Sequence, residues 1–247
     1  MIKTLALAAA LVLSAGTTLA EPTHVMVRGQ ALDAKFIGDH MGGVEVTLTD
    51  PKGHILARGL AKGGTGDTGR IMNAPHVRGE AITDEATSGF EAMLDLDQPT
   101  LVTATARGPM GKPASAVTVT SQMWVLPGRN VTGDGWILTF PGLVIEPRIV
   151  VGTGGEISVA THVSLMCGCP IEPGGLWDAA RYSIEAQLMK GDQVIASAPL
   201  SYAGKTSEFA GTLKGTMPGS YRLRLVARDS GSANAGVVEQ KVVVPKP

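Results

Sequence analysis

The chain alternates apolar and polar residues in many places, and this period of two restricts its fold more than any other feature. The alternation covers residues 44–49, 101–106, 116–120, 157–165, 182–188 and 221–226. A period of two places every second side chain on one face, which is typical of a strand with one buried face. The best helix candidate after the first 20 residues, residues 177–182, is less than about two turns long. The pattern therefore predicts an all-β protein.

Turn-forming residues separate the predicted strands. Glycine and proline occur with polar residues at 50–53, 190–192 and 218–219, where each has a backbone reason to form a turn. Many short strands joined by such turns favour sandwiches or barrels. A glycine-rich break at residues 152–155 follows the segment 141–148, which resembles the end of a strand set. We therefore expect two consecutive β-sandwich domains, residues 21–148 and residues 149–247.

The first 20 residues have the pattern of a cleaved signal peptide. Lys3 precedes an apolar run at residues 5–13, and small residues lead to a cleavage site after Ala20. The apolar run is too short for a membrane span, which needs about 20 residues. We therefore expect a periplasmic or secreted protein that has no membrane span.

The charge of the mature chain is nearly balanced. Removing Lys3 from 21 basic residues leaves 20 against 22 acidic residues, a net charge of −2. This balance gives no electrostatic footprint for nucleic acid, so we expect no nucleic-acid partner.

The first half has the layout of a known family of sandwiches. Residues 44–59, VEVTLTDPKGHILARG, form a predicted hairpin, which is followed by Ser88-Gly89-Phe90 and an alternating strand at 99–106. This order resembles the transthyretin-like, carboxypeptidase-regulatory-like β-sandwiches over residues 27–106. The chain departs from that pattern by a long insertion at residues 61–87, for which we favour a surface loop.

The second half resembles an immunoglobulin-like or fibronectin-III-like domain over residues 149–244. The resemblance rests on the run 217–229, MPGSYRLRLVARD, and on a final strand at 237–244. In such domains the tyrosine, here Tyr221, pins a corner to upstream backbone. These folds host many functions, so the resemblance implies the architecture alone.

The two cysteines of the chain lie in the segment His162-Val-Ser-Leu-Met166-Cys167-Gly168-Cys169. Thiolate and thioether ligands select copper(I) or zinc, so His162, Met166, Cys167 and Cys169 form a candidate metal site with copper as the expected cofactor. A straight strand would place His162 and Met166 on one face and Cys167 on the other. Convergence therefore requires a bend, which Gly168 can supply.

Three other interpretations of the cysteine segment compete with a metal site. The first is a Cys167–Cys169 disulfide in a structural protein, with no cofactor, and the second is thiol–disulfide redox chemistry. The third is a pair of thiols packed at the end of a strand. Trp177 either covers the cysteines or packs between sheets.

Further His/Met pairs occur at residues 24–26, 40–41 and 72–76, and two tryptophans, Trp124 and Trp136, flank a predicted turn. The tryptophans either pack in the first core or present an adhesive edge to a partner. Nucleophile elbows, zinc-protease motifs and nucleotide fingerprints are absent from the sequence. We therefore expect a non-enzymatic binding or accessory protein that handles copper, or a structural module that binds a protein partner in the cell envelope.

Overall fold

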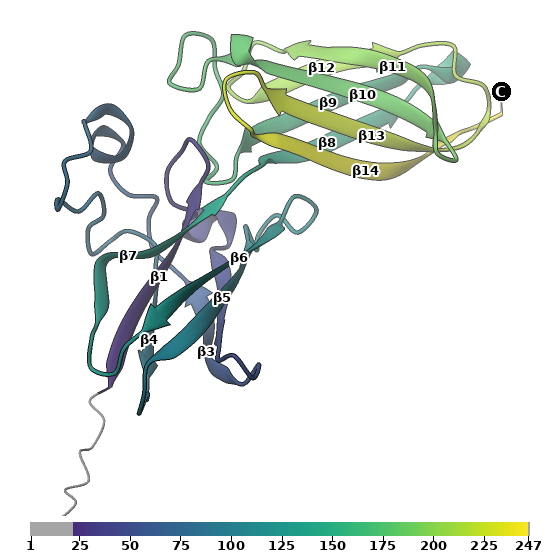
Figure 1. The fold of residues 1–247 in the computed structure, drawn as a ribbon. Coiled ribbons are helices and arrows are strands. Elements are labelled where there is room, and N and C mark those ends of the chain that lie inside the picture. The colour runs from purple at the N-terminus through teal and green to yellow at the C-terminus, as the bar shows by residue number, and fades with distance from the viewer. Residues whose placement is uncertain (1–21, 247) are drawn as a thin grey trace, which may run out of the picture.

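The computed structural model describes residues 22–246, which form two packed β-sandwiches (Figure 1). The expected all-β class with two consecutive sandwiches is confirmed. The expected signal peptide, residues 1–20, lies outside the described residues. Within residues 22–246, none of the helices has the length and apolar character needed to span a bilayer.

The first sandwich packs a three-stranded sheet, β4-β1-β7, against a four-stranded sheet, β3-β2-β5-β6. Strands β1 and β7 are parallel, and the other neighbours are antiparallel. The resemblance to transthyretin-like sandwiches stays a prediction. The strands are β1 Thr23–Ala31, β2 Val44–Thr49, β3 Ile55–Ala61, β4 Phe90–Leu94, β5 Thr100–Gly108, β6 Val117–Val125 and β7 Val131–Phe140.

The second sandwich has the strand order of an immunoglobulin-like domain. Strands β8, β9 and β12 form one layer, and β14, β13, β10 and β11 form the other. Two residue pairs join β11 to β12 and connect the layers at one side. The strands are β8 Leu143–Val151, β9 Ile157–Leu165, β10 Tyr182–Lys190, β11 Gln193–Tyr202, β12 Glu208–Leu213, β13 Gly219–Asp229 and β14 Ala235–Val244.

The tyrosine corner expected from the sequence is present. The Tyr221 hydroxyl donates a hydrogen bond of 2.8 Å to the carbonyl oxygen of Met217, four residues upstream. Tyr221 is buried, so this bond fixes the entry into β13 on the core side of the layer.

Helical segments are short, as the absence of a helical stripe predicts. Asp178 begins the last of them, and its side chain caps the segment by accepting a hydrogen bond from the Ala180 backbone N–H. The four segments within residues 22–246 are η1 Asp39–Met41, the π-helical η2 Gly69–Asn73, η3 Thr153–Gly155 and η4 Ala179–Arg181.

The predicted domain boundary at 148/149 falls inside β8. This strand pairs with β9 along its whole length, so strand pairing places the change of sandwich at Pro141 and Gly142. The segment 145–148 resembles the end of a strand because Pro147 interrupts it. Proline is tolerated there because β8 is an edge strand. The glycine-rich break at 152–155 is the turn between β8 and β9.

The insertion at residues 61–87 is held against the first sandwich by Arg28 of β1. The buried Arg28 guanidinium donates hydrogen bonds to the carbonyl oxygens of Thr87 and Ser88, the latter at 2.9 Å. Asp134 of β7 accepts hydrogen bonds from the backbone of Ile82 and Thr83. The loop expected from the sequence is therefore anchored at its C-terminal end.

Candidate functional site

The cysteine segment forms a tight turn after β9, and this turn is the bend that the sequence predicts. Gly168 has a φ of +74°, a conformation that favours glycine. Its N–H donates to the Leu165 carbonyl oxygen at 2.8 Å, and the Leu165 N–H donates back to the Cys169 carbonyl oxygen at 3.3 Å. The turn brings Cys167 and Cys169 together as a disulfide. Of the competing interpretations, the disulfide is therefore confirmed.

The other two predicted metal ligands lie elsewhere. His162 is half-buried on β9, where its Nδ1 lies 3.4 Å from a carboxylate oxygen of Glu208. Burial raises the pKa of Glu208, but its hydrogen bonds with Arg148 and His162 outweigh this and hold the pKa below its usual range. Met166 is buried. Its Cε atom packs closely against Gly142, which lies between β7 and β8.

The predicted set of four convergent ligands is therefore not assembled in the oxidised chain. Within residues 22–246, no three or more His, Cys, Asp or Glu side chains are grouped as a metal site. Copper binding at His162, Met166, Cys167 and Cys169 stays a prediction.

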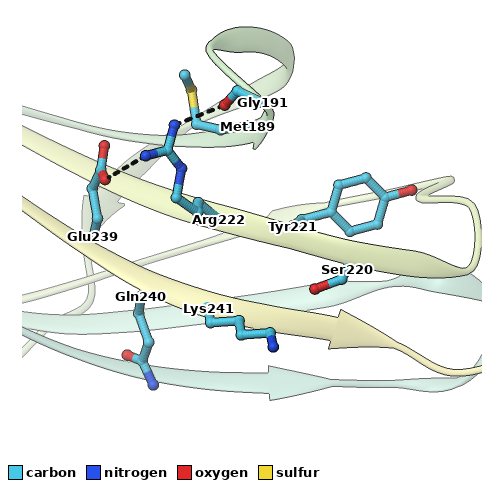
Figure 2. Close-up of a pocket in the computed structure, with 8 residues that line it drawn as sticks. All are labelled: Met189, Gly191, Ser220, Tyr221, Arg222, Glu239, Gln240 and Lys241. Atoms are coloured by element: carbon cyan, nitrogen blue, oxygen red, sulfur yellow. Dashed lines mark hydrogen bonds and ion pairs between the residues drawn. The ribbon is translucent and has the colours of Figure 1, made fainter.

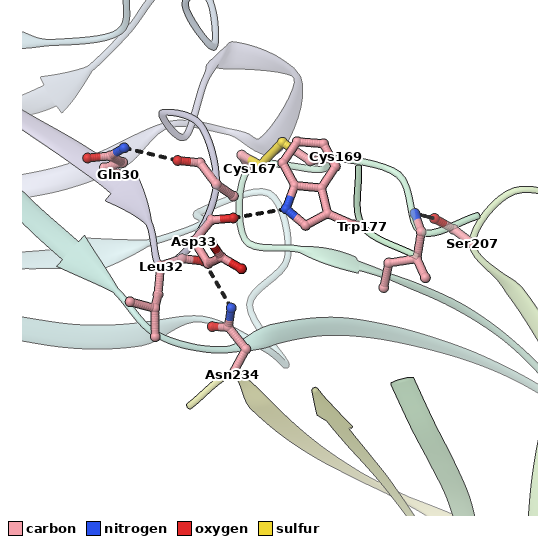
Figure 3. Close-up of a disulfide and its surroundings, with 10 residues drawn as sticks. Gln30, Leu32, Asp33, Cys167, Cys169, Trp177, Ser207 and Asn234 are labelled. Carbon is pink, nitrogen blue, oxygen red and sulfur yellow. Dashed lines mark hydrogen bonds between the residues drawn. A yellow bond between two sulfur atoms is a disulfide. The ribbon is translucent and has the colours of Figure 1, made fainter. Parts of the chain in front are cut away.

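Trp177 lies beside the disulfide and also joins the two sandwiches (Figure 3). Its indole N–H donates a hydrogen bond of 2.9 Å to the Asp33 carbonyl oxygen, which belongs to the loop after β1. The side chain is buried, and it borders the same cavity as Cys167 and Cys169. Trp177 belongs to the hydrophobic core, as the packed alternative predicts, and it lies beside the cysteines at the junction between the sandwiches.

An ion pair between the half-buried Arg181 and the buried Asp229 supports the same junction. Arg181 donates two hydrogen bonds to Asp229, at 2.9 and 3.1 Å, and its guanidinium also lies 3.3 Å from Asp33 of the first sandwich. Burial raises the pKa of Asp229, but hydrogen bonds from Gly231, Ser232 and Arg181 outweigh it and leave the pKa below its usual value. Bidentate pairs of this kind fix orientation because both partners are geometrically constrained.

Asn234 adds a neutral link at the junction. Its side-chain N–H₂ donates to the Leu32 carbonyl oxygen at 2.9 Å (Figure 3). Its side-chain oxygen accepts from the Gly142 N–H at 2.8 Å. The buried apolar residues of both sandwiches form one continuous core across this region. Because these contacts join the two sandwiches through one packed junction, we expect the sandwiches to move as a single rigid unit.

The junction contains a cavity of about 330 Å³ beside the disulfide. His40 and Lys35 of the first sandwich border it together with Cys167, Gly168 and Cys169. A Cβ atom on Gly168 would lie 2.6 Å from His40 Nε2 and 2.8 Å from Met41 Sδ. The sequence marks His40 and Met41 as a His/Met pair, but only the tertiary structure brings this pair to the cysteine turn.

Three larger cavities lie elsewhere on the second sandwich, and one of them, of about 610 Å³, lies over β8, β9 and β12. A second, of about 480 Å³, lies over β13 and β14, where Arg222 is already bonded to the Gly191 carbonyl oxygen and to Glu239 (Figure 2). The third, of about 950 Å³, is formed by glycine-rich loops and Met217 at the far end of the sandwich. None of these three adjoins the disulfide turn.

Strand β6 presents a different kind of candidate surface. Three sheets give six edge strands within the described residues, and β6 is the one that contains no charged residue, glycine or proline. The other five are interrupted by such residues: Arg58 in β3, Glu91 in β4, Asp134 in β7, Pro147 in β8 and Lys241 in β14.

The two tryptophans near this edge have separate roles. Trp136 is buried in the first core, whereas Trp124 on β6 is 61% exposed opposite Leu101 of β5. Leu126, just beyond the strand, is also exposed. The sequence offered a core position and an adhesive edge as alternatives. Trp136 takes the core position, and Trp124 takes the exposed position at the edge.

Comparisons with known proteins identify no family. No family model matches the chain, and no curated protein matches it. Among solved structures, the selenomethionine-substituted chicken interferon gamma receptor alpha chain is similar at 10% identity. The match covers 93% of this chain and 100% of that one, with a TM-score of 0.34. The immunoglobulin-like assignment of the second sandwich rests on its strand pairing.

Proposed function

We propose that this protein is an exported, non-enzymatic module that binds a protein partner by adding a strand of that partner to β6. The observation that carries the proposal is the uncharged edge of β6, nine residues long, with the exposed Trp124 near its end. Its export rests on the expected signal peptide, and an envelope or extracellular partner follows from that.

An exposed edge strand has unpaired backbone groups that accept another strand, and proteins normally protect such edges with charges, proline or bulges. β6 lacks the charges and the proline that interrupt the other edges. In strand addition, main-chain hydrogen bonds supply affinity and alternate side chains supply specificity. On β6 those alternate outward side chains are Thr118, Thr120, Gln122 and Trp124.

The expected chemistry of the partner follows from these side chains. A threonine and glutamine row offers hydrogen-bonding groups without charge, and Trp124 offers a large apolar surface of the type enriched in binding hot spots. The partner segment is therefore expected to be extended and uncharged, with an apolar side chain opposite Trp124.

Site-specific photocrosslinking tests this proposal. A photoreactive amino acid replaces Gln122 on β6, and a matched control replaces Thr47, which faces the same side of the sheet from the interior strand β2. Irradiation in cells that export the protein is expected to give one adduct with a foreign protein from position 122 and none from position 47.

A charged edge supplies the second arm of the test. Thr120→Lys places a charge on the edge, whereas Thr105→Lys places the same charge on its cross-strand neighbour in β5. Thr120→Lys is expected to abolish the adduct without lowering the melting temperature, and Thr105→Lys to leave the adduct in place. Equal adducts from positions 122 and 47, no adduct at all, or an adduct of two copies of this chain would overturn the proposal.

Soft-metal handling is the second candidate function, and one observation favours it. The structure brings His40 and Met41 to the turn that contains both cysteines. In the oxidised chain the sulfur atoms are bonded to each other, so this function requires the reduced chain. Thiol–disulfide redox activity would require the same reduction.

A further inference from the structure

The junction places the His40–Met41 pair of the first sandwich against Gly168, the residue between Cys167 and Cys169. Cys167 and Cys169 flank Gly168, and a Cβ atom on that glycine would lie 2.6 Å from His40 Nε2 and 2.8 Å from Met41 Sδ. The imidazole nitrogen and the thioether sulfur of the first sandwich are therefore in contact with the residue between the two cysteines of the second.

Three of the four candidate donors, Met41, Cys167 and Cys169, are buried, whereas His40 is exposed. Cys167 and Cys169 are 1% and 3% exposed, yet they border the cavity of about 330 Å³ together with His40. Trp177 closes one side of this cavity. Lys35 also borders the cavity and supplies positive charge, while Glu172 supplies negative charge and is bonded to Thr206.

We propose that reduction of the disulfide converts this junction into a copper(I) site formed by Cys167, Cys169 and Met41, with His40 as an additional ligand. A dithiol reductant transfers two electrons and two protons to the Cys167–Cys169 bond. The sulfur–sulfur bond breaks, two thiols form and the reductant becomes a disulfide. Copper(I) then displaces the two thiol protons, and its own oxidation state does not change.

Copper(I) is favoured by the chemistry of the donors. Thiolate and thioether ligands select copper(I) over hard cations. Two thiolates on one copper(I) ion leave a net charge of −1, and the cationic Lys35 borders the same cavity. The proposed donor set keeps both cysteines of the sequence-based set and replaces His162 and Met166 with His40 and Met41, which lie across the junction.

Competition for copper(I) between the protein and a chromophoric chelator, under anaerobic conditions, tests the proposal. The full mature chain is reduced with dithiothreitol, desalted and titrated, and an oxidised sample is the control. The reduced chain is expected to bind one copper(I) ion and the oxidised chain none.

Matched variants distinguish the two donor sets. Met41→Leu and His40→Gln are each expected to weaken the affinity of the reduced chain for copper(I) by about tenfold or more. Met166→Leu and His162→Gln are the matched controls and are expected to leave the affinity unchanged. Met41→Leu conserves core volume, and His40 is exposed, so at least one of these variants remains folded.

Two results would overturn the proposal. One is the absence of stoichiometric copper(I) binding by the reduced chain. The other is the reverse pattern, in which Met166→Leu and His162→Gln weaken binding and the variants at Met41 and His40 do not. Neither result bears on partner binding at β6, because the crosslinking arm uses the oxidised chain at a separate surface.

Discussion

Gly168→Ala tests the contact between the cysteine turn and the first sandwich. Two costs are expected. An L-residue in a left-handed conformation costs about 1–2 kcal/mol, and Gly168 has a φ of +74°. The added methyl would also lie 2.8 Å from the sulfur of the buried Met41, and overpacking of this kind typically costs about 1–3 kcal/mol. The free energy of unfolding should therefore fall by about 2–5 kcal/mol.

Gly174→Ala is the matched control for this prediction. Gly174 lies in the same loop and has a φ of +67°, but a Cβ atom there would have no neighbour within 4 Å. It should therefore lose only the conformational cost, about 1–2 kcal/mol. Urea unfolding followed by tryptophan fluorescence measures both variants. Equal losses for the two variants would refute the packing argument, because the junction contact is the only difference expected between them.

Three further predictions concern other parts of the structure. Tyr221→Phe should lose about 0.5–1.5 kcal/mol of unfolding free energy from the tyrosine-corner bond, whereas Tyr202→Phe should lose little; equal urea midpoints for the two variants would contradict this. The lowered pKa of Asp229 stabilises the folded chain fully above about pH 4, and this contribution is lost as the pH falls. Asp229→Asn should therefore flatten the stability profile below that pH, and a profile parallel to the wild type would argue against it. Arg28→Met should expose residues 61–87 to limited trypsin digestion while both sandwiches remain resistant; an unchanged digestion pattern would show that Arg28 does not anchor the insertion.

Much of the fold could be predicted from the sequence because strand signals are local. Alternation located β2 and β9 with the bounds that the structure has, and Gly168 indicated the bend before the structure showed it. The domain boundary at 148/149 stays a prediction, and it was drawn near Pro147 because proline resembles the end of a strand. Only sheet order reveals that β8 is an edge strand, where proline is tolerated.

The composition of the candidate site depended on contacts that the sequence does not contain. A disulfide and a metal site would both use Cys167 and Cys169, so the sequence cannot separate these interpretations. The structure separates them because it shows the two sulfur atoms bonded to each other. His162 is close to the cysteines in the chain but faces Glu208, whereas His40 is more than 120 residues away and reaches the turn. Similarly, the lack of charge in β6 indicates a binding surface only when the sheet order shows that β6 is an edge strand.

The claim that the sandwiches form one rigid unit is tested most directly by residual dipolar couplings of backbone amides in the oxidised chain. A single alignment tensor is expected to fit couplings from β1, β2 and β5 together with those from β9, β10 and β13. Tensors of clearly different magnitude for the two sets would mean that the sandwiches reorient independently, which would contradict the junction described here.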